Sequence, residues 1–76
     1  MKNPNYRLDR IQAKIATQDP ELRRAVFYKD SNRCVDCGSR GSLELWHVKP
    51  VIYGGETVIN NLVTLCKPCR LHKPLD

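Results

Sequence analysis

The 76-residue sequence lacks long apolar runs, internal repeats, low-complexity tracts and Ser/Gly-rich linkers. Its first ten residues, MKNPNYRLDR, contain no apolar stretch, which argues against a signal peptide and against a membrane span. A chain of this length has room for one hydrophobic core and usually needs a cross-link or a metal to be stable. We therefore expect one folded unit that does not contact a membrane and that resides in the cytoplasm.

Acidic residues are also scarce relative to basic ones. The chain has 13 Lys and Arg against 8 Asp and Glu, which gives a formal net charge of +5. Each Lys or Arg placed near a phosphate releases a condensed counterion, so a basic balance favours a polyanionic partner. The charge agrees with nucleic-acid binding, and it agrees equally with a soluble domain that is merely basic.

A first helix is predicted near the N-terminus. Asn3 is a favoured N-cap residue, and Pro4 suits the first helical position. Apolar residues then recur at helical spacing with basic residues between them: Tyr6, Leu8, Ile11 and Ile15, with Arg7, Arg10 and Lys14. Three roles are open for this helix, namely a DNA clamp, a dimer contact or a cap on the core.

A second helix is predicted to follow directly. Residues 19–21, with the sequence DPE, repeat the start signal and place an acid in the first turn, where the helix dipole favours it. We expect the helix to run to about Asp30. Its apolar residues Leu22, Val26 and Phe27 should turn inward.

The second half of the chain predicts shorter elements. In order they are a strand at 43–48, a loop at 51–60, a strand at 62–65 and a short helix from Lys67. Pro50 should end the first strand because it cannot donate to a ladder. Side chains alternate along a strand, so Trp46 and His47 should point in opposite directions.

Four cysteines form two C-x2-C pairs separated by 28 residues: Cys34, Cys37, Cys66 and Cys69. Two such turns supply the four thiolates of a tetrahedral zinc site. With all four positions filled by sulfur, this zinc would be structural and would stabilise a small core. Two disulfides or an iron–sulfur centre are the competing interpretations.

The segment between the cysteine pairs is more specific. It reads C-x2-C-G, then LELWHVKP, then GG, then NLVTLC-x2-C. This order resembles the HNH endonuclease family with its ββα-metal (His-Me finger) fold, over about 22–73. The residues that match the family pattern are His47, Pro50, Gly54, Gly55, Asn61 and Leu62.

The resemblance implies a chemistry for two of these residues. His47 matches the general base, and a neutral imidazole can take a proton from water at neutral pH. Asn61 matches the asparagine that orients that base. A divalent cation, Mg²⁺, Mn²⁺, Ni²⁺ or Zn²⁺, would stabilise charge on the scissile phosphate.

Two positions depart from the family pattern. Trp46 stands where the family has a metal-binding Asp or His, and Arg70 stands where it has His or Asn. An indole N–H is only a donor and a guanidinium is a permanent cation, so neither binds a metal. His72 is a candidate substitute ligand, although it lies about 200° around a helix from residue 70.

The same residues allow structural interpretations. His47 can be a packed histidine that bonds to Asn61, and Trp46 can be a rim or core aromatic rather than a residue that stacks on a base. Arg70 can be part of an ordinary solvated cluster or can replace the missing cation on a phosphate. The residues expected to bind nucleic acid are Trp46, Lys49, Lys67, Arg70 and Lys73.

Taken together, these patterns predict an α+β fold, in which two N-terminal helices precede a small zinc-stabilised ββα-metal domain. Residues 1–20 form the helical extension and residues 21–76 the HNH-like domain, within one folded unit. The expected function is nucleic-acid binding, with DNA as the partner and metal-dependent phosphodiester hydrolysis from an altered site. The alternative is an inactive module that acts on DNA or on a protein partner.

Overall fold

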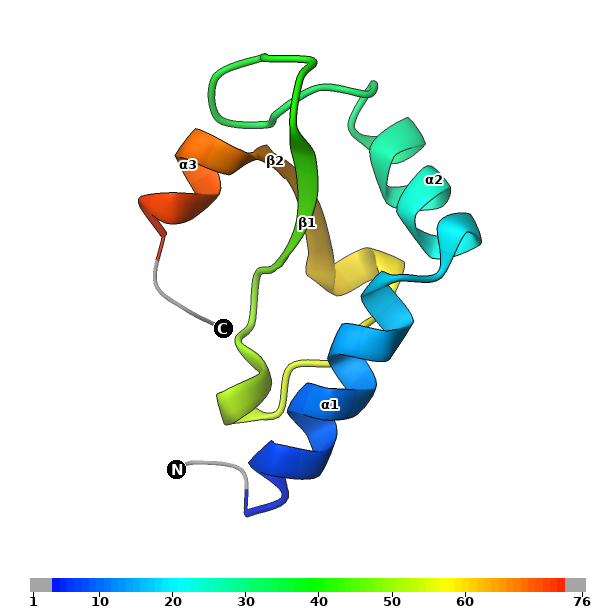
Figure 1. The fold of residues 1–76 in the computed structure, drawn as a ribbon, viewed down its shortest axis with the longest axis vertical. Helices are drawn as coiled ribbons and strands as arrows, with labels where there is room; N and C mark the ends of the chain where they lie inside the picture. The colour runs from blue at the N-terminus through cyan, green and yellow to red at the C-terminus, as the bar shows by residue number, and fades with distance from the viewer. Residues whose placement is uncertain (1–3, 74–76) are drawn as a thin grey trace.

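The computed structural model describes residues 4–73 and confirms the α+β class. Helices flank a two-stranded sheet on both sides (Figure 1). Within the described residues, no helix is both long enough and apolar enough to cross a membrane. The elements in chain order are α1 (Tyr6–Thr17), α2 (Pro20–Lys29), β1 (Leu43–His47), the 3-10 turns η1 (Val51–Tyr53) and η2 (Ile59–Asn61), β2 (Leu62–Cys66) and α3 (Lys67–Leu71).

The sheet is an antiparallel hairpin of β1 and β2, in which His47 pairs with Leu62 and Leu45 pairs with Thr64. Because side chains alternate, Leu45 and His47 share one face and Trp46 lies on the other. α2 packs against the first face, and α3 packs against the second (Figure 1). The prediction that Trp46 and His47 point in opposite directions is confirmed.

α2 begins and packs as the sequence predicts. The Asp19 carboxylate accepts a hydrogen bond from the Glu21 N–H at 3.0 Å, which satisfies one free donor of the first turn. Val26 is fully buried and contacts Leu45 and Leu62, and the partly buried apolar residues Leu22 and Phe27 cover this cluster. This small core holds α2 on the sheet.

The outer edge of β2 is covered by the turn that follows α2. The Asp30 carboxylate accepts the Thr64 N–H at 2.8 Å, and the Val35 N–H donates to the Thr64 carbonyl at 3.0 Å. Burial raises the pKa of Asp30, but hydrogen bonds from Lys29 and Thr64 outweigh it and leave the pKa below its ordinary value. β2 is therefore paired with β1 along one edge and, at Thr64, with the segment after α2 along the other.

α1 differs from its prediction in where it starts. It begins at Tyr6 rather than Pro4, which lies in a preceding turn, and Asn3 lies outside the described residues. Ala13 is the buried residue, and α1 packs against η1 and α2. The small Ala13 permits this close approach, and the larger apolar residues face solvent with 58–64% exposure: Leu8, Ile11 and Ile15.

Candidate functional site

The four cysteines converge at one end of the hairpin. Their sulfur atoms all lie within 4.8 Å of one another, and Cys37 Sγ is 3.5 Å from Cys66 Sγ. A disulfide needs about 2 Å, whereas tetrahedral zinc with bonds of about 2.3 Å separates its sulfurs by about 3.8 Å. The cluster thus fits a four-thiolate metal site, and the disulfide interpretation does not fit this spacing.

The backbone around the cysteines favours thiolates. The first knuckle closes through Gly38, whose φ of +80° suits glycine and whose N–H donates to the Cys34 carbonyl at 2.9 Å. Burial raises the pKa of Cys34, but N–H groups of Cys66, Cys37 and Asp36 outweigh it and lower the pKa to about 6.

The pKa of a second thiol, that of Cys69, indicates that the cluster needs a compensating positive charge. Hydrogen bonds with neighbouring cysteine side chains raise the pKa of Cys69 above its ordinary value, those with Cys66 first and Cys37 next. Four sulfurs this close cannot all ionise without a compensating cation. A divalent metal would supply that charge, and zinc prefers this donor set and geometry.

At the opposite end of β1, His47 is buried beside the loop. It is 5% exposed, and its Nε2 lies 2.9 Å from the Thr57 hydroxyl. A hydroxyl both donates and accepts, so Thr57 can pair with this nitrogen in either tautomer. The loop residue Thr57 therefore helps to orient the ring, and the sequence interpretation did not include it.

Asn61 fixes the loop that carries Thr57. Its Oδ1 accepts the Lys49 N–H at 2.8 Å, and its Nδ2 donates to the Lys49 carbonyl at 3.1 Å and the Glu56 carbonyl at 2.8 Å. The described hydrogen bonds of this side chain thus reach backbone rather than the ring. Asn61 acts on His47 through the loop that presents Thr57.

Gly55 closes the same loop and tolerates no side chain. A Cβ at this position would lie 1.8 Å from the Lys49 carbonyl oxygen, and the Gly55 N–H donates to the Pro50 carbonyl at 3.0 Å. This close approach of two backbone segments requires glycine. Gly55, the second residue of the glycine pair in the sequence, thus has a packing role in this loop.

Trp46 packs on the α3 side of the hairpin. It lies against the cluster of Cys34, Leu65 and Cys66, and the Lys73 ammonium is 5.6 Å from its ring centroid. Its Nε1 is buried without a hydrogen-bond partner among the described residues. The ring is only partly exposed and has a cation over it, which agrees with the packed aromatic and disfavours base stacking.

The basic residues expected to bind nucleic acid divide into two groups. Arg70 Nε lies 3.5 Å from Glu44, and Lys73 Nζ lies 3.0 Å from Asp36, so an acid offsets each of these charges. Two other lysines are exposed and have no ion pair among residues 4–73: Lys49 and Lys67.

A catalytic cation does not fit the positions that the family uses. Trp46 offers only an N–H donor, and the Arg70 guanidinium repels a metal. His72 lines a hollow beside the cysteine cluster rather than the cavity of His47. Within the described residues, the cysteines are the only group of three or more ligand-type side chains close enough for one metal.

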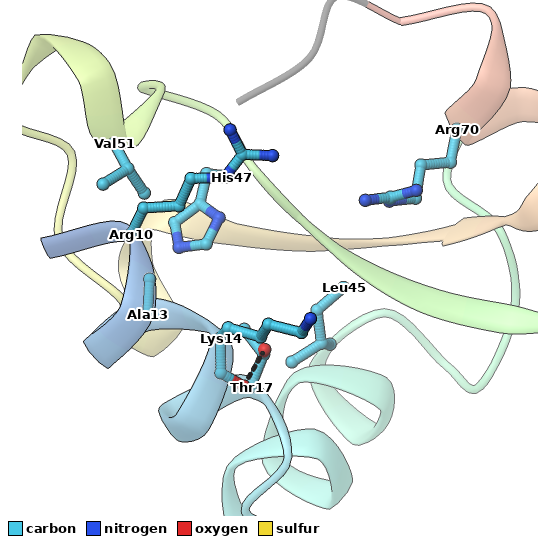
Figure 2. A pocket seen from close by; sticks show the side chains of 8 residues that line it. All are labelled: Arg10, Ala13, Lys14, Thr17, Leu45, His47, Val51 and Arg70. Atoms are coloured by element: carbon cyan, nitrogen blue, oxygen red, sulfur yellow. Dashed lines mark hydrogen bonds between the residues drawn. The ribbon is translucent and has the colours of Figure 1, made fainter. Parts of the chain in front are cut away.

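A cavity of about 310 Å³ opens beside His47 (Figure 2). α1 forms one wall, and Arg70 approaches from α3 on the other side of β1. Among residues 4–73, the lining combines cations and small residues without an acid: Arg10, Ala13, Lys14, Thr17, Leu45, His47, Val51 and Arg70. The sequence interpretation missed Arg10 and Lys14, although their four-residue spacing on a helix was the available signal.

Comparison with protein families matches residues 34–73 to HNH endonuclease. Comparison with curated proteins and with solved structures found no significant match. The matched region covers more than half of the chain and contains all four cysteines, His47 and the whole hairpin. The chain is therefore a member of the HNH endonuclease family, in which the cysteine cluster is complete and two catalytic metal-ligand positions are substituted.

Proposed function

We propose that this protein binds DNA and does not cleave it by the metal-dependent reaction of its family. The observation that carries the proposal is the pair Trp46 and Arg70, which places an indole and a guanidinium where metal ligands belong. Membership in a family of nucleases and a net charge of +5 support a nucleic-acid partner. A positive side chain contacts a phosphate well, whereas it excludes Mg²⁺ or Mn²⁺.

The cysteine cluster has a structural role in this proposal, with zinc as its metal. The metal would join the first knuckle, which precedes β1, to the start of α3, which follows β2. No position at four thiolates stays open for a water or a phosphate. The metal would stabilise the fold without taking part in chemistry.

Titration of labelled duplex DNA with the zinc-loaded protein at several salt concentrations tests binding. We expect the affinity to fall steeply with salt, because phosphate contacts release counterions. The double variant Lys49→Gln with Lys67→Gln should reduce the salt dependence by about two counterions. Binding that does not change with salt, or that occurs only with a protein partner, would contradict the proposal.

A second candidate function is phosphodiester hydrolysis with His47 as general base. Its support is the geometry of the ring, which Thr57 contacts and which lies at the wall of a basic cavity. In this reading Asn61 orients the base and His72 binds a metal only after a local rearrangement. Plasmid nicking with Mg²⁺, Mn²⁺, Ni²⁺ or Zn²⁺ that disappears in His47→Ala would favour this function over the first.

A further inference from the structure

We propose that α1 completes a binding site for a single phosphate group beside His47, with Lys14 and Arg10 as the contacting cations. This inference rests on the proposed nucleic-acid binding and deepens it, because it assigns the phosphate contact to a helix outside the family match at residues 34–73. The expected ligand is one phosphodiester of a DNA backbone. Free inorganic phosphate carries the same chemistry and serves as the probe.

The first support is the spacing of the cavity residues on α1. Arg10, Lys14 and Thr17 line the cavity together with the buried Ala13 (Figure 2). These positions fall on one helical face, so the two cations project toward the same space. Asp9 lines a different cavity, which also contains Glu56. α1 thus presents Asp9 to one cavity and its cations Arg10 and Lys14 to another, and Ala13 lies between the two.

The second support is that no acid of residues 4–73 offsets the charges of the α1 cations. No acidic side chain among residues 4–73 forms an ion pair with Lys14 or Arg10. Arg10 Nη1 donates to the neutral Tyr6 hydroxyl at 3.0 Å, which holds the guanidinium without cancelling its charge. Its other N–H groups are left to contact an anion, and charge-assisted hydrogen bonds to phosphate are the strong class.

The third support is the size and composition of the cavity. Its 310 Å³ lies near the lower end of small-ligand sites, which span about 300–1,000 Å³. A phosphate with its first waters fits such a space. Arg70 adds a third cation at the far wall, 3.5 Å from Glu44. Because three cationic side chains converge there, the site suits an anionic group such as one backbone phosphate.

Thermal unfolding of the zinc-loaded protein in inorganic phosphate, against chloride at the same ionic strength, tests the site directly. We expect phosphate to raise the unfolding temperature of the wild type, because a ligand that binds the folded state stabilises it. Lys14→Gln and Arg10→Gln should each weaken phosphate affinity by about tenfold or more. Lys14→Arg should restore it.

Arg7→Gln is the matched control. Arg7 lies on the same helix, carries the same charge and shares a second hollow with Arg10 and Lys14, but it does not line the cavity beside His47. It should keep phosphate affinity within about twofold, because an exposed charge outside the site contributes little. Circular dichroism without phosphate checks that every variant is folded.

The outcomes separate this inference from the proposed function. If Lys14→Gln and Arg10→Gln bind phosphate as Arg7→Gln does, the site assignment is wrong, even where the wild type binds DNA. If phosphate stabilises the wild type and the two variants lose that effect while DNA does not bind, the site stands and DNA binding is wrong. If the same two variants lose both ligands, both proposals are supported.

Discussion

The two ends of the hairpin differ in the metal-binding groups that they offer. At one end four thiols lie within 4.8 Å of one another, with backbone N–H groups directed at Cys34. At the other end His47 keeps its orienting contacts, while Trp46 and Arg70 replace the ligands that a cation needs. The end that stabilises the fold is complete, and the end that would support hydrolysis is not.

This difference shows that the loop at the His47 end is held in place without metal ligands. The loop beside His47 is tightly built, since Asn61 makes three hydrogen bonds to backbone and Gly55 lies against Lys49. Such a loop presents a rigid surface whether or not a metal is bound. The hairpin can therefore serve binding after its cation position is lost, provided that protein side chains neutralise the phosphate instead.

The largest expected effect is loss of the metal at the cysteine end. Structural zinc contributes roughly 10–16 kcal/mol of apparent free energy in small domains, comparable with the whole stability of a chain this size. A strong chelator or Cys66→Ser should therefore unfold the domain, as followed by circular dichroism, and added zinc should refold the chelated protein. His72→Ala leaves all four thiolates and should melt like the wild type. An unchanged melting temperature in chelator would contradict a structural metal.

The next largest effect on stability is expected from a substitution of Gly55, at the His47 end. Gly55→Ala forces a Cβ to within 1.8 Å of the Lys49 carbonyl oxygen, and backbone on both sides resists movement. We expect a loss of about 3 kcal/mol or more in the free energy of unfolding, measured by urea denaturation. Gly41→Ala meets no atom within 4 Å and should change stability by about 0.5 kcal/mol at most. Equal effects of the two changes would show that the loop is not tightly built.

Asp30 gives a smaller, pH-dependent effect in the region between the two ends. Its pKa is lowered in the folded state, so its stabilisation is present above the unfolded pKa of about 3.9 and is lost as the pH falls through the folded pKa. Asp30→Asn should remove this loss of stability at low pH. It should also lower the free energy of unfolding at pH 7 by about 1 to 2 kcal/mol, measured by denaturation across pH 2–7. Asp36→Asn, which breaks only a surface pair with Lys73, should cost at most about 0.5 kcal/mol. A pH profile of Asp30→Asn identical to the wild type would refute this role.

The smallest expected effect is a gain of metal binding at the His47 end. The double variant Trp46→His with Arg70→His restores imidazole at both substituted positions and removes a repelling cation. Calorimetry with the zinc-loaded protein should detect weak Ni²⁺ binding that is absent from the wild type, and slow plasmid nicking should accompany it. Trp46→Phe with Arg70→Lys repeats both substitutions without adding a ligand. If the two double variants bind Ni²⁺ equally, loss of ligands does not explain the altered site.

The sequence predicts the cysteine end, α2 and the hairpin because local rules determine them. Cysteine spacing fixes the knuckles, the Asp-Pro start fixes α2, and alternation fixes which face of β1 carries His47. The start signal at Asn3 and Pro4 placed the start of α1 two residues too early, since proline can also occupy the turn before a helix.

The direction in which α1 faces could not be predicted from its pattern. An apolar stripe normally faces the core, yet here the small Ala13 packs inward while Ile11 and Ile15 remain exposed. Which face of α1 packs inward depends on the shape of η1 and α2, which lie elsewhere in the chain. The contact between Thr57 and His47 depends likewise on a loop conformation that has no local sequence signal.

The covered edge of β2 has a consequence for the fate of the protein without its metal. Val35, which pairs with the Thr64 carbonyl, lies in the knuckle between Cys34 and Cys37. Without a metal, this knuckle would lose its anchor, and the Thr64 carbonyl at the strand edge would be freed. An unpaired edge is a template for strand pairing with another chain. The metal-free protein should therefore aggregate through this strand, so the metal also protects solubility.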